Sequence, residues 1–141
     1  MALFRKAYVD VTAQTDVIVI SHEVKRIVLE SGLKEGVVNV FVPVGTSGVT
    51  LLENDPKIYE NYQKCLEDQI PSIEEKRPQR KSGTGHTFAH LRAAWVGHSV
   101  QIPIAEGKLQ TGPWQEILLF DFDDKVGRRE YFIFVMGEAA K

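Results

Sequence analysis

The sequence has one cysteine, almost no net charge and no long uninterrupted run of hydrophobic residues. The single cysteine, Cys65, excludes an intrachain disulfide and a metal cluster built from cysteines. The net charge of −2, from 17 Lys plus Arg and 19 Asp plus Glu, argues against a general nucleic-acid binder. Neither a signal peptide nor a membrane span is predicted, because Asn39 and Pro43 interrupt the longest apolar stretch, residues 37–44. We therefore expect a cytoplasmic protein with no nucleic-acid or membrane partner.

The composition that is present is that of one globular domain. Hydrophobic residues make up 43% of the 141 residues and charged residues 26%. A chain of this length buries roughly 70% of the surface that its unfolded form exposes. Because no internal repeat and no Pro/Gly-rich linker divides the chain, a single domain is expected over residues 1–141.

Runs rich in Val, Ile, Thr and aromatic residues predict that strands dominate. Residues 7–20 predict a β-hairpin, because polar residues 14–16 interrupt such a run. Residues 36–44 predict a strand buried on both faces, and a strand resumes at 49–52. Further strands are expected at 98–104, 115–122 and 128–136. The last two are expected to pair as a hairpin, with one face on the core and the other on a partner subunit.

Two helices are predicted between these strands with clear end signals, and a third follows a polar loop. Ser21 as N-cap and Gly32 as the left-handed C-terminal residue bound the first helix. Asp55-Pro56 begins the second, whose apolar stripe includes Cys65 as a small core residue. Residues 86–95 are predicted to form the third. The order of elements predicts an α+β fold.

His86 and His90 are the first candidates for chemistry. On a helix, residues four apart lie on one face, which suits two ligands of one metal ion or a proton-transfer pair. A zincin-type hydrolase would need glutamate at position 87, and this chain has Thr87. The alternative is two unrelated histidines, one at the helix start and one packed against a neighbour.

A basic, glycine-containing loop over residues 76–85 leads into the helix that begins near His86. Free N–H groups at a helix N-terminus attract anions, and added cations make a phosphate or pyrophosphate site plausible. The alternative is a solvated surface loop. The predicted ligand-binding residues of this loop are Lys76, Arg77, Arg80, Lys81, Gly83 and Gly85.

Two further positions stand beside turns. Glu53 lies at a strand–helix junction, where a carboxylate can act as a general base or a magnesium ligand, or can simply be a surface group. Trp114 and Gln115 follow Gly112-Pro113, which is consistent with a pocket wall or with a core anchor.

Five short segments in the second half of the chain form one ordered pattern: Ala89-His90-Leu91, Gly97-His98-Ser99, Ile102-Pro103-Ile104, Gly107-Lys108-Leu109 and Gly112-Pro113-Trp114-Gln115. Taken together, these segments resemble the YjbQ-like family, labelled secondary thiamine-phosphate synthase. Their order and spacing match the family pattern over about a third of the chain, and the resemblance spans nearly all of it. The Asp-Phe-Asp of residues 121–123 and the arginine pair at 128–129 also match.

The resemblance implies a β-sandwich with two to three helices that associates as a homotrimer. It also implies a weak activity that joins an aminopyrimidine pyrophosphate to a thiazole phosphate and releases pyrophosphate. The residues that it places in or beside the pocket are His90, Gln115, Thr46, Ser47 and Glu53.

The chain departs from the family pattern at several site positions. Many relatives have histidine at the position of Gly45, asparagine at that of His86 and threonine at that of Pro113. A second family histidine, expected after Pro71, has no counterpart in residues 72–81. If the family site uses a histidine cluster, this chain keeps His90 and has His86 as a replacement.

The leading hypothesis is therefore a YjbQ-like transferase of phosphorylated ligands, with His90, Glu53 and Gln115 as catalytic residues. Loop cations and a divalent ion (Mg or Zn) would stabilise the departing pyrophosphate, with Glu53 holding the metal and Trp114 lining the pocket. One alternative is a non-catalytic module that binds a phosphorylated ligand. Another is a metal-dependent hydrolase that uses His86 and His90.

Overall fold

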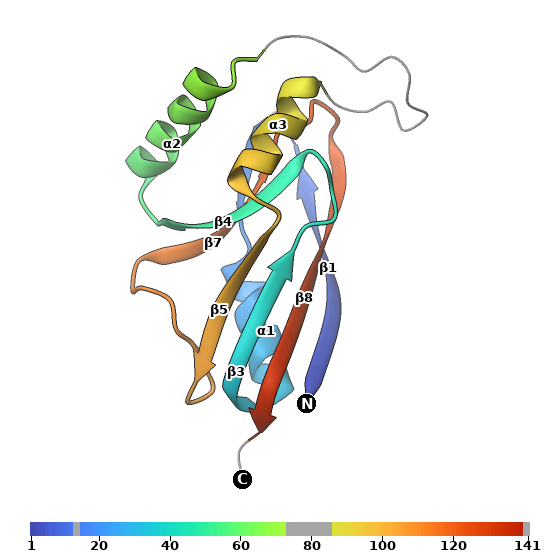
Figure 1. The fold of residues 1–141 in the computed structure, drawn as a ribbon, viewed down its shortest axis with the longest axis vertical. Coiled ribbons are helices and arrows are strands. Elements are labelled where there is room, and N and C mark those ends of the chain that lie inside the picture. Colours follow the sequence, from blue (N-terminus) through green and yellow to red (C-terminus); the bar gives the residue numbers. More distant parts are fainter. Residues whose placement is uncertain (13–14, 73–85, 140–141) are drawn as a thin grey trace.

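The structure is a computed structural model, and it describes residues 1–12, 15–72 and 86–139. The described part contains three helices and two antiparallel sheets, so the predicted α+β class is confirmed (Figure 1). None of the described helices has the length and apolar character needed to cross a membrane. The elements in chain order are β1 (Ala2–Val11), β2 (Asp16–Val19), α1 (Ser21–Ser31), β3 (Leu33–Phe41), β4 (Ser47–Glu53), α2 (Pro56–Gln69), α3 (Thr87–Val96), β5 (Ser99–Ala105), β6 (Lys108–Leu109), β7 (Gln115–Asp121) and β8 (Gly127–Ala139).

The strands form one five-stranded sheet, β1-β8-β3-β5-β6, and one three-stranded sheet, β2-β7-β4. Both predicted hairpins are therefore wrong in their pairing, although their strands exist. β1 pairs with β8 and β2 pairs with β7, so each supposed hairpin contributes its two strands to different sheets. Turn residues between two strands indicate that the chain reverses direction there. Which strand each of them pairs with by hydrogen bonds depends on the tertiary packing.

The main core lies between the five-stranded sheet and α1, which covers one face of that sheet (Figure 1). Val38 and Val40 of β3 point inward, as do Ile133 and Val135 of β8. The opposite face of this sheet is uncovered in the described part of the chain. The prediction that residues 36–44 are buried on both faces is therefore wrong, because Phe41 remains 40% exposed.

A second core lies where α2 and α3 cover β7. Leu118, Phe120 and Phe122 are fully buried there and pack with Leu66 of α2 and Phe88 of α3. Cys65 is exposed, so its prediction as a core residue is wrong. Leu66 is the only residue of α2 that is buried, and Tyr59, Tyr62 and Ile70 pack against the same core while they stay partly exposed.

The predicted helix ends are confirmed except at Ser21. The Asp55 carboxylate accepts the Lys57 N–H at 2.9 Å, and Gly32 has the left-handed φ of 70°. α1 begins at Ser21 with Ile20 at the N-cap position. Ser21 instead joins α1 to β7, because its hydroxyl donates to the Glu116 carboxylate and accepts the Ile117 N–H.

Candidate functional site

A buried ion pair lies where β4 begins and β7 ends. Asp121 is fully buried, and it is the register partner of Ser47. The Arg129 guanidinium donates to both of its carboxylate oxygens, Nε to Oδ1 at 3.1 Å and Nη2 to Oδ2 at 3.2 Å. The Ser47 hydroxyl donates to Oδ1 at 2.6 Å, and the Thr46 hydroxyl lies 3.4 Å from the same oxygen. The bidentate pair therefore fixes the start of β8 and the 46–47 turn to the end of β7.

A contact between a carboxylate and a histidine lies beside this ion pair. Asp124 Oδ2 is 3.2 Å from Nε2 of His86, whose side chain is only 6% exposed. When Nε2 donates this hydrogen bond, Nδ1 of the neutral ring is an acceptor. Nδ1 is buried and has no hydrogen-bond partner among the residues that the structure describes. The His86 ring stacks on Phe88 at 5.2 Å between centroids, so its plane is held by packing as well.

Asp123 connects the two contacts. Its Oδ1 accepts the Asp124 N–H at 2.8 Å, and its Oδ2 lies 3.9 Å from Arg129 Nη2. Burial raises the pKa of the Asp123 carboxyl, and a side-chain hydrogen bond with the Asp124 carboxyl and the charge of Asp121 raise it further, whereas the backbone N–H groups of Lys125 and Asp124 lower it. A protonated Asp123 would relieve the repulsion among three carboxyl groups so close together.

The His90 imidazole lies against the backbone of Gly45, the residue before Thr46. A Cβ atom built on Gly45 would lie 3.0 Å from His90 Nδ1 and 3.1 Å from Cε1. Glycine therefore lets the chain before β4 pass against the imidazole. We refer to the group as the polar cluster, and its members are Thr46, Ser47, His86, His90, Asp121, Asp123, Asp124 and Arg129.

The contacts of His86 bear on the predicted metal site, in which His86 and His90 would be ligands. Among the described residues, no three His, Cys, Asp or Glu side chains converge as metal ligands. His86 directs Nε2 at Asp124. Within one chain, the described side chains therefore supply no set of three ligands for the predicted Mg or Zn ion, which stays a prediction.

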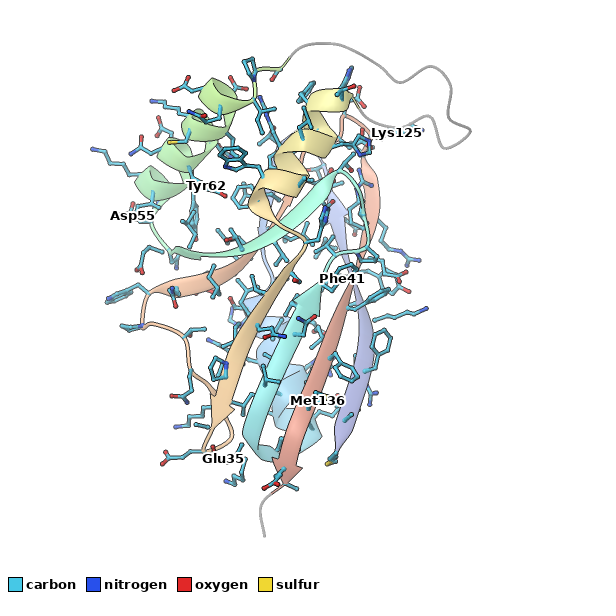
Figure 2. The ribbon with its side chains drawn as sticks, in the orientation of Figure 1. Glu35, Phe41, Asp55, Tyr62, Lys125 and Met136 are labelled. Carbon is cyan, nitrogen blue, oxygen red and sulfur yellow. The ribbon has the colours of Figure 1, made fainter. Side chains whose placement is uncertain are left out.

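The remaining predicted site residues lie at the other end of the same strand pair. Glu53 is the register partner of Gln115, whereas Ser47 is that of Asp121. At about 3.4 Å per residue, these two ends are about 20 Å apart. Figure 2 shows the same separation, with Asp55 and Lys125 on opposite sides of the molecule. Within one chain, the predicted site residues therefore fall into two groups at opposite ends of the strand pair. The first group is Thr46, Ser47, His86 and His90, and the second is Glu53, Trp114 and Gln115.

Trp114 and Gln115 are held by their own turn. The Trp114 carbonyl accepts the Asn54 N–H at 2.7 Å, and the Gln115 side chain accepts the Gly112 N–H at 2.8 Å. The Trp114 side chain is 70% exposed, so it is not a core anchor. The six predicted loop ligands, Lys76, Arg77, Arg80, Lys81, Gly83 and Gly85, lie outside the described residues.

Sequence reasoning gave no role to Asp121, Asp124 and Arg129. A signal for Asp121 was present, because a carboxylate between Phe120 and Phe122 interrupts a strand that is otherwise apolar on both faces. A charged residue in such a strand requires a buried partner. The sequence does not reveal that Arg129 is that partner, since the two strands belong to different sheets.

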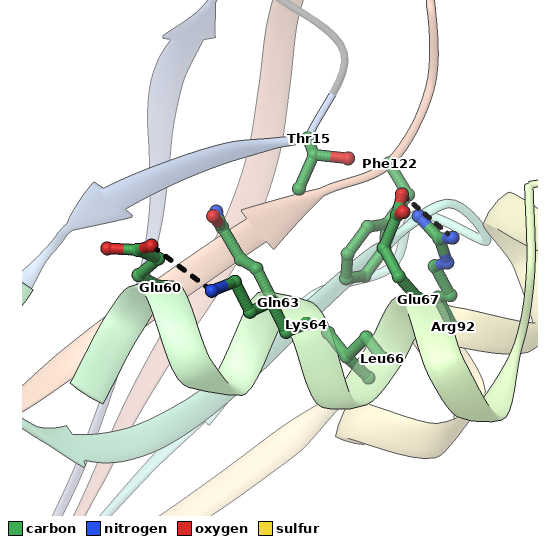
Figure 3. A pocket seen from close by; sticks show the side chains of 8 residues that line it. All are labelled: Thr15, Glu60, Gln63, Lys64, Leu66, Glu67, Arg92 and Phe122. Carbon is green, nitrogen blue, oxygen red and sulfur yellow. Dashed lines mark hydrogen bonds and ion pairs between the residues drawn. The ribbon is translucent and has the colours of Figure 1, made fainter. Parts of the chain in front are cut away.

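A cavity of about 260 Å³ lies between α2 and Phe122, with Arg92 on its wall (Figure 3). The Arg92 side chain is 2% exposed, and its guanidinium lies 4.9 Å from the Phe88 ring centroid. It donates to the Ile70 carbonyl and to the Ser72 hydroxyl, both at 2.9 Å, and lies 3.4 Å from Glu67. These bonds tie the end of α2 to α3, so Arg92 has a structural role.

Comparison with known proteins gives a consistent result. Residues 5–138 match the profile of the family described as UPF0047 protein YjbQ-like. A UPF0047 protein of Methanocaldococcus jannaschii is 34% identical over 110 residues, which cover 77% of this chain and 76% of the relative. The UPF0047 protein YugU of Bacillus subtilis is 28% identical over 136 residues, covering 96% of this chain and all of the relative.

Solved structures agree with the fold. A YbjQ-like protein of unknown function from Sulfolobus solfataricus superposes with a TM-score of 0.87 at 28% identity, covering 98% of this chain and 99% of that one. An uncharacterised conserved protein of the YjbQ/UPF0047 family from Clostridium acetobutylicum has a TM-score of 0.82 at 31% identity, covering 94% and 99%. The chain therefore belongs to the YjbQ-like UPF0047 family, whose members include these proteins of unknown function.

Proposed function

We propose that the polar cluster binds a small phosphorylated ligand and that His90 exchanges a proton with it. The observation that carries this proposal is the start of α3. Its N-cap residue is His86, which makes no side-chain cap, and its first turn contains no acidic residue. A helix N-terminus without a capping oxygen favours an anion, because backbone N–H groups and the helix dipole both attract negative charge.

The charges around the helix start are compatible with an anionic ligand. Arg129 neutralises Asp121 through two hydrogen bonds, and the raised pKa of Asp123 favours its uncharged form. The Asp124 carboxylate has His86 Nε2 at 3.2 Å as a hydrogen-bond partner. Repulsion of a phosphate by the three carboxyl groups is therefore reduced.

The reaction that fits the family resemblance is transfer from an aminopyrimidine pyrophosphate to a thiazole phosphate, with release of pyrophosphate. Both substrates carry phosphate groups that the α3 N-terminus would bind. The thiazole ring nitrogen forms the new C–N bond as the C–O bond to pyrophosphate breaks, and this nitrogen has no proton to lose. His90, one turn into the same helix, would therefore donate a proton to the departing pyrophosphate. Glu53, Gln115 and Trp114 have no part in this step within one chain, because they lie about 20 Å away along β4 and β7.

Purified full-length protein incubated with both thiamine precursors tests this function, with pyrophosphate release as the readout. We expect turnover that falls at least 100-fold in His90→Ala, in line with the usual contribution of a positioned acid or base. His22→Ala is the matched control, since His22 is an exposed histidine on α1. Full turnover in His90→Ala would remove His90 from this role.

A non-catalytic binding module is the second candidate, favoured by Gly45 standing where many relatives have histidine. Calorimetric titration with thiazole phosphate distinguishes it from the transferase. Saturable binding that His90→Ala weakens, together with no pyrophosphate release, would identify a binding module. The metal-dependent hydrolase has no supporting cluster of three ligands among the described side chains.

The uncovered face of the five-stranded sheet supports the predicted homotrimer as part of the proposal. Phe4, Phe41 and Met136 on this face are 40–46% exposed, and Phe41 stacks on Phe132 at 6.2 Å (Figure 2). An apolar patch of this kind marks an interface. Light scattering should give a trimer mass that Phe41→Asp reduces. The predicted β-sandwich packing and the cytoplasmic location likewise stay predictions.

A further inference from the structure

The edges of the two sheets are protected unequally. Among the described strands, β6 and β2 are short edges of two and four residues, and β4 is covered by α3, with the Val49 N–H donating to the Gly97 carbonyl at 2.9 Å. β1 is different, because it spans ten residues and pairs only with β8 in the described part of the chain. Figure 1 shows it at the margin of the five-stranded sheet. An edge this long presents unpaired backbone N–H and C=O groups that a further strand can use.

A groove of about 480 Å³ runs beside the middle of this edge. Its walls are residues 6–9 of β1 and the start of α1, and its apolar lining includes Val19 and Ile20. Tyr131 lines the groove and is the register partner of Ala7. Because the side chain of Ala7 is small, the larger side chain of Tyr131 fits beside it. The Tyr131 side chain is 1% exposed, and none of the hydrogen bonds found among described residues involves its hydroxyl.

Charges on β1 specify how a second copy would pair. Even-numbered residues of β1 share the outer face, so Lys6, Tyr8 and Asp10 lie in one row, and all three are exposed. Lys6 and Asp10 form no ion pair with a described residue. In an antiparallel pair with Tyr8 opposite Tyr8 of the partner subunit, Lys6 faces Asp10 of the partner subunit twice. Shifting the strands by four residues either way sets Lys6 against Lys6, or Asp10 against Asp10, of the partner subunit.

We propose that β1 pairs antiparallel with β1 of a second copy of this chain, about a two-fold axis through Tyr8. The pairing satisfies the open backbone groups, forms two cross-strand charge pairs and places two tyrosines side by side. On the inner face it sets Val9 of the partner subunit beside Ala7, over the groove that Tyr131 lines. The pairing uses the backbone edge of β1 and adjoins the exposed apolar face of the five-stranded sheet, because Phe4 of that face belongs to the same strand.

Charge exchange tests the register. Lys6→Asp sets two carboxylates opposite each other, and Asp10→Lys sets two ammonium groups opposite each other. Each single variant should halve the mass measured by sedimentation velocity at a concentration where the natural chain is associated. Lys6→Asp/Asp10→Lys should restore that mass, because both pairs reform with reversed polarity. Singles that keep the full mass, or a double variant that fails to regain it with an unchanged circular dichroism spectrum, overturn the proposal.

Cross-linking tests the axis independently, in a Cys65→Ser background that removes the exposed native thiol. Opposed residues of antiparallel strands have Cβ atoms about 4.5–5.5 Å apart, close to disulfide reach. Tyr8→Cys should therefore form a symmetric intermolecular disulfide on mild oxidation. Lys6→Cys is the matched control on the same face of the same strand, and it should stay uncross-linked. Cross-linking at position 6 in place of position 8 contradicts the proposed register.

Discussion

The two ends of the β4–β7 strand pair have opposite characters, although the same backbone ladder connects them. At the polar end, Ser47 faces a fully buried Asp121 that Arg129 neutralises. At the solvent end, Glu53 faces Gln115, and the neighbouring Trp114 is 70% exposed. Both ends carry polar residues at strand–turn junctions, but these residues are buried only at the end that contains Ser47 and Asp121.

This difference separates residues that hold the fold from residues that are free to contact other molecules. A buried carboxylate depends on its partner, because an unpaired charge in the interior is costly. An exposed carboxylate or indole has water in place of a partner, and its removal changes the fold little. Substitutions at matched positions along the β4–β7 strand pair therefore test whether the two ends differ in this way.

The largest effect is expected for Asp121→Asn. The substitution keeps the shape of the side chain and leaves the Arg129 guanidinium without its counter-charge. Removing one partner of a buried pair costs about 3 kcal/mol or more. Urea denaturation should show a loss of this size in the free energy of unfolding.

Glu53→Gln is the control at the solvent end, six positions away on the paired strand. Because Glu53 is exposed, we expect a change within about 0.5 kcal/mol. Equal losses for Asp121→Asn and Glu53→Gln would show that the two ends do not differ in the way that burial implies.

A smaller effect is expected for Gly45→Ala. The added methyl carbon would lie 3.0 Å from His90 Nδ1, so the imidazole has to move by a few tenths of an ångström. We expect a loss of about 1 kcal/mol, together with a shifted NMR resonance for the His90 ring. Gly112→Ala is the matched control, because its methyl would meet only the flexible end of Gln115 at 3.3 Å. An unmoved His90 resonance would contradict the close approach.

Asp123→Asn should change the pH dependence of stability at the polar end. The folded state raises the pKa of Asp123 above its ordinary 3.8, mainly by burial, so it binds this proton more tightly than the unfolded chain does. Stability contributed by this group is therefore present below 3.8 and is lost as the pH rises through the folded pKa. Asparagine does not titrate, so the variant should gain stability relative to the natural chain between acidic and neutral pH. Denaturation at several pH values measures the difference, and parallel curves would contradict the prediction.

The smallest effect is expected for Trp114→Ala. Although tryptophan is the largest side chain, this one is 70% exposed, and its backbone carbonyl keeps its bond to the Asn54 N–H after substitution. The midpoint of thermal unfolding should stay almost unchanged, within the equivalent of about 0.5 kcal/mol. A loss of several kcal/mol would mean that the solvent end is buried after all.

Sequence reasoning located the elements better than it paired them. Asp55-Pro56 and Gly32 marked helix ends correctly, because capping depends on residues within a few positions of each other. The position of β7 was also predicted, since it is a continuous apolar run. The partner of β7 was predicted wrongly, because strand pairing depends on residues distant in the chain.

The same distinction applies to the candidate site. Helical spacing singled out His86 and His90, and the family resemblance implied Thr46 and Ser47. The structure brings all four to one end of the molecule. Glu53 and Gln115 looked equally suitable in the sequence, and the register of β4 with β7 holds them at the other end.

Local features of the sequence were sufficient to predict the α+β class, the limits of most helices and strands, and the resemblance to the YjbQ-like family. These properties follow from periodicity, caps and motif spacing, which are local. Only the tertiary structure decided that Asp121 and Arg129 meet, that the supposed hairpins separate into two sheets, and that β1 is left as a long open edge. The physical reason is that burial and hydrogen-bond pairing are satisfied by the whole chain at once.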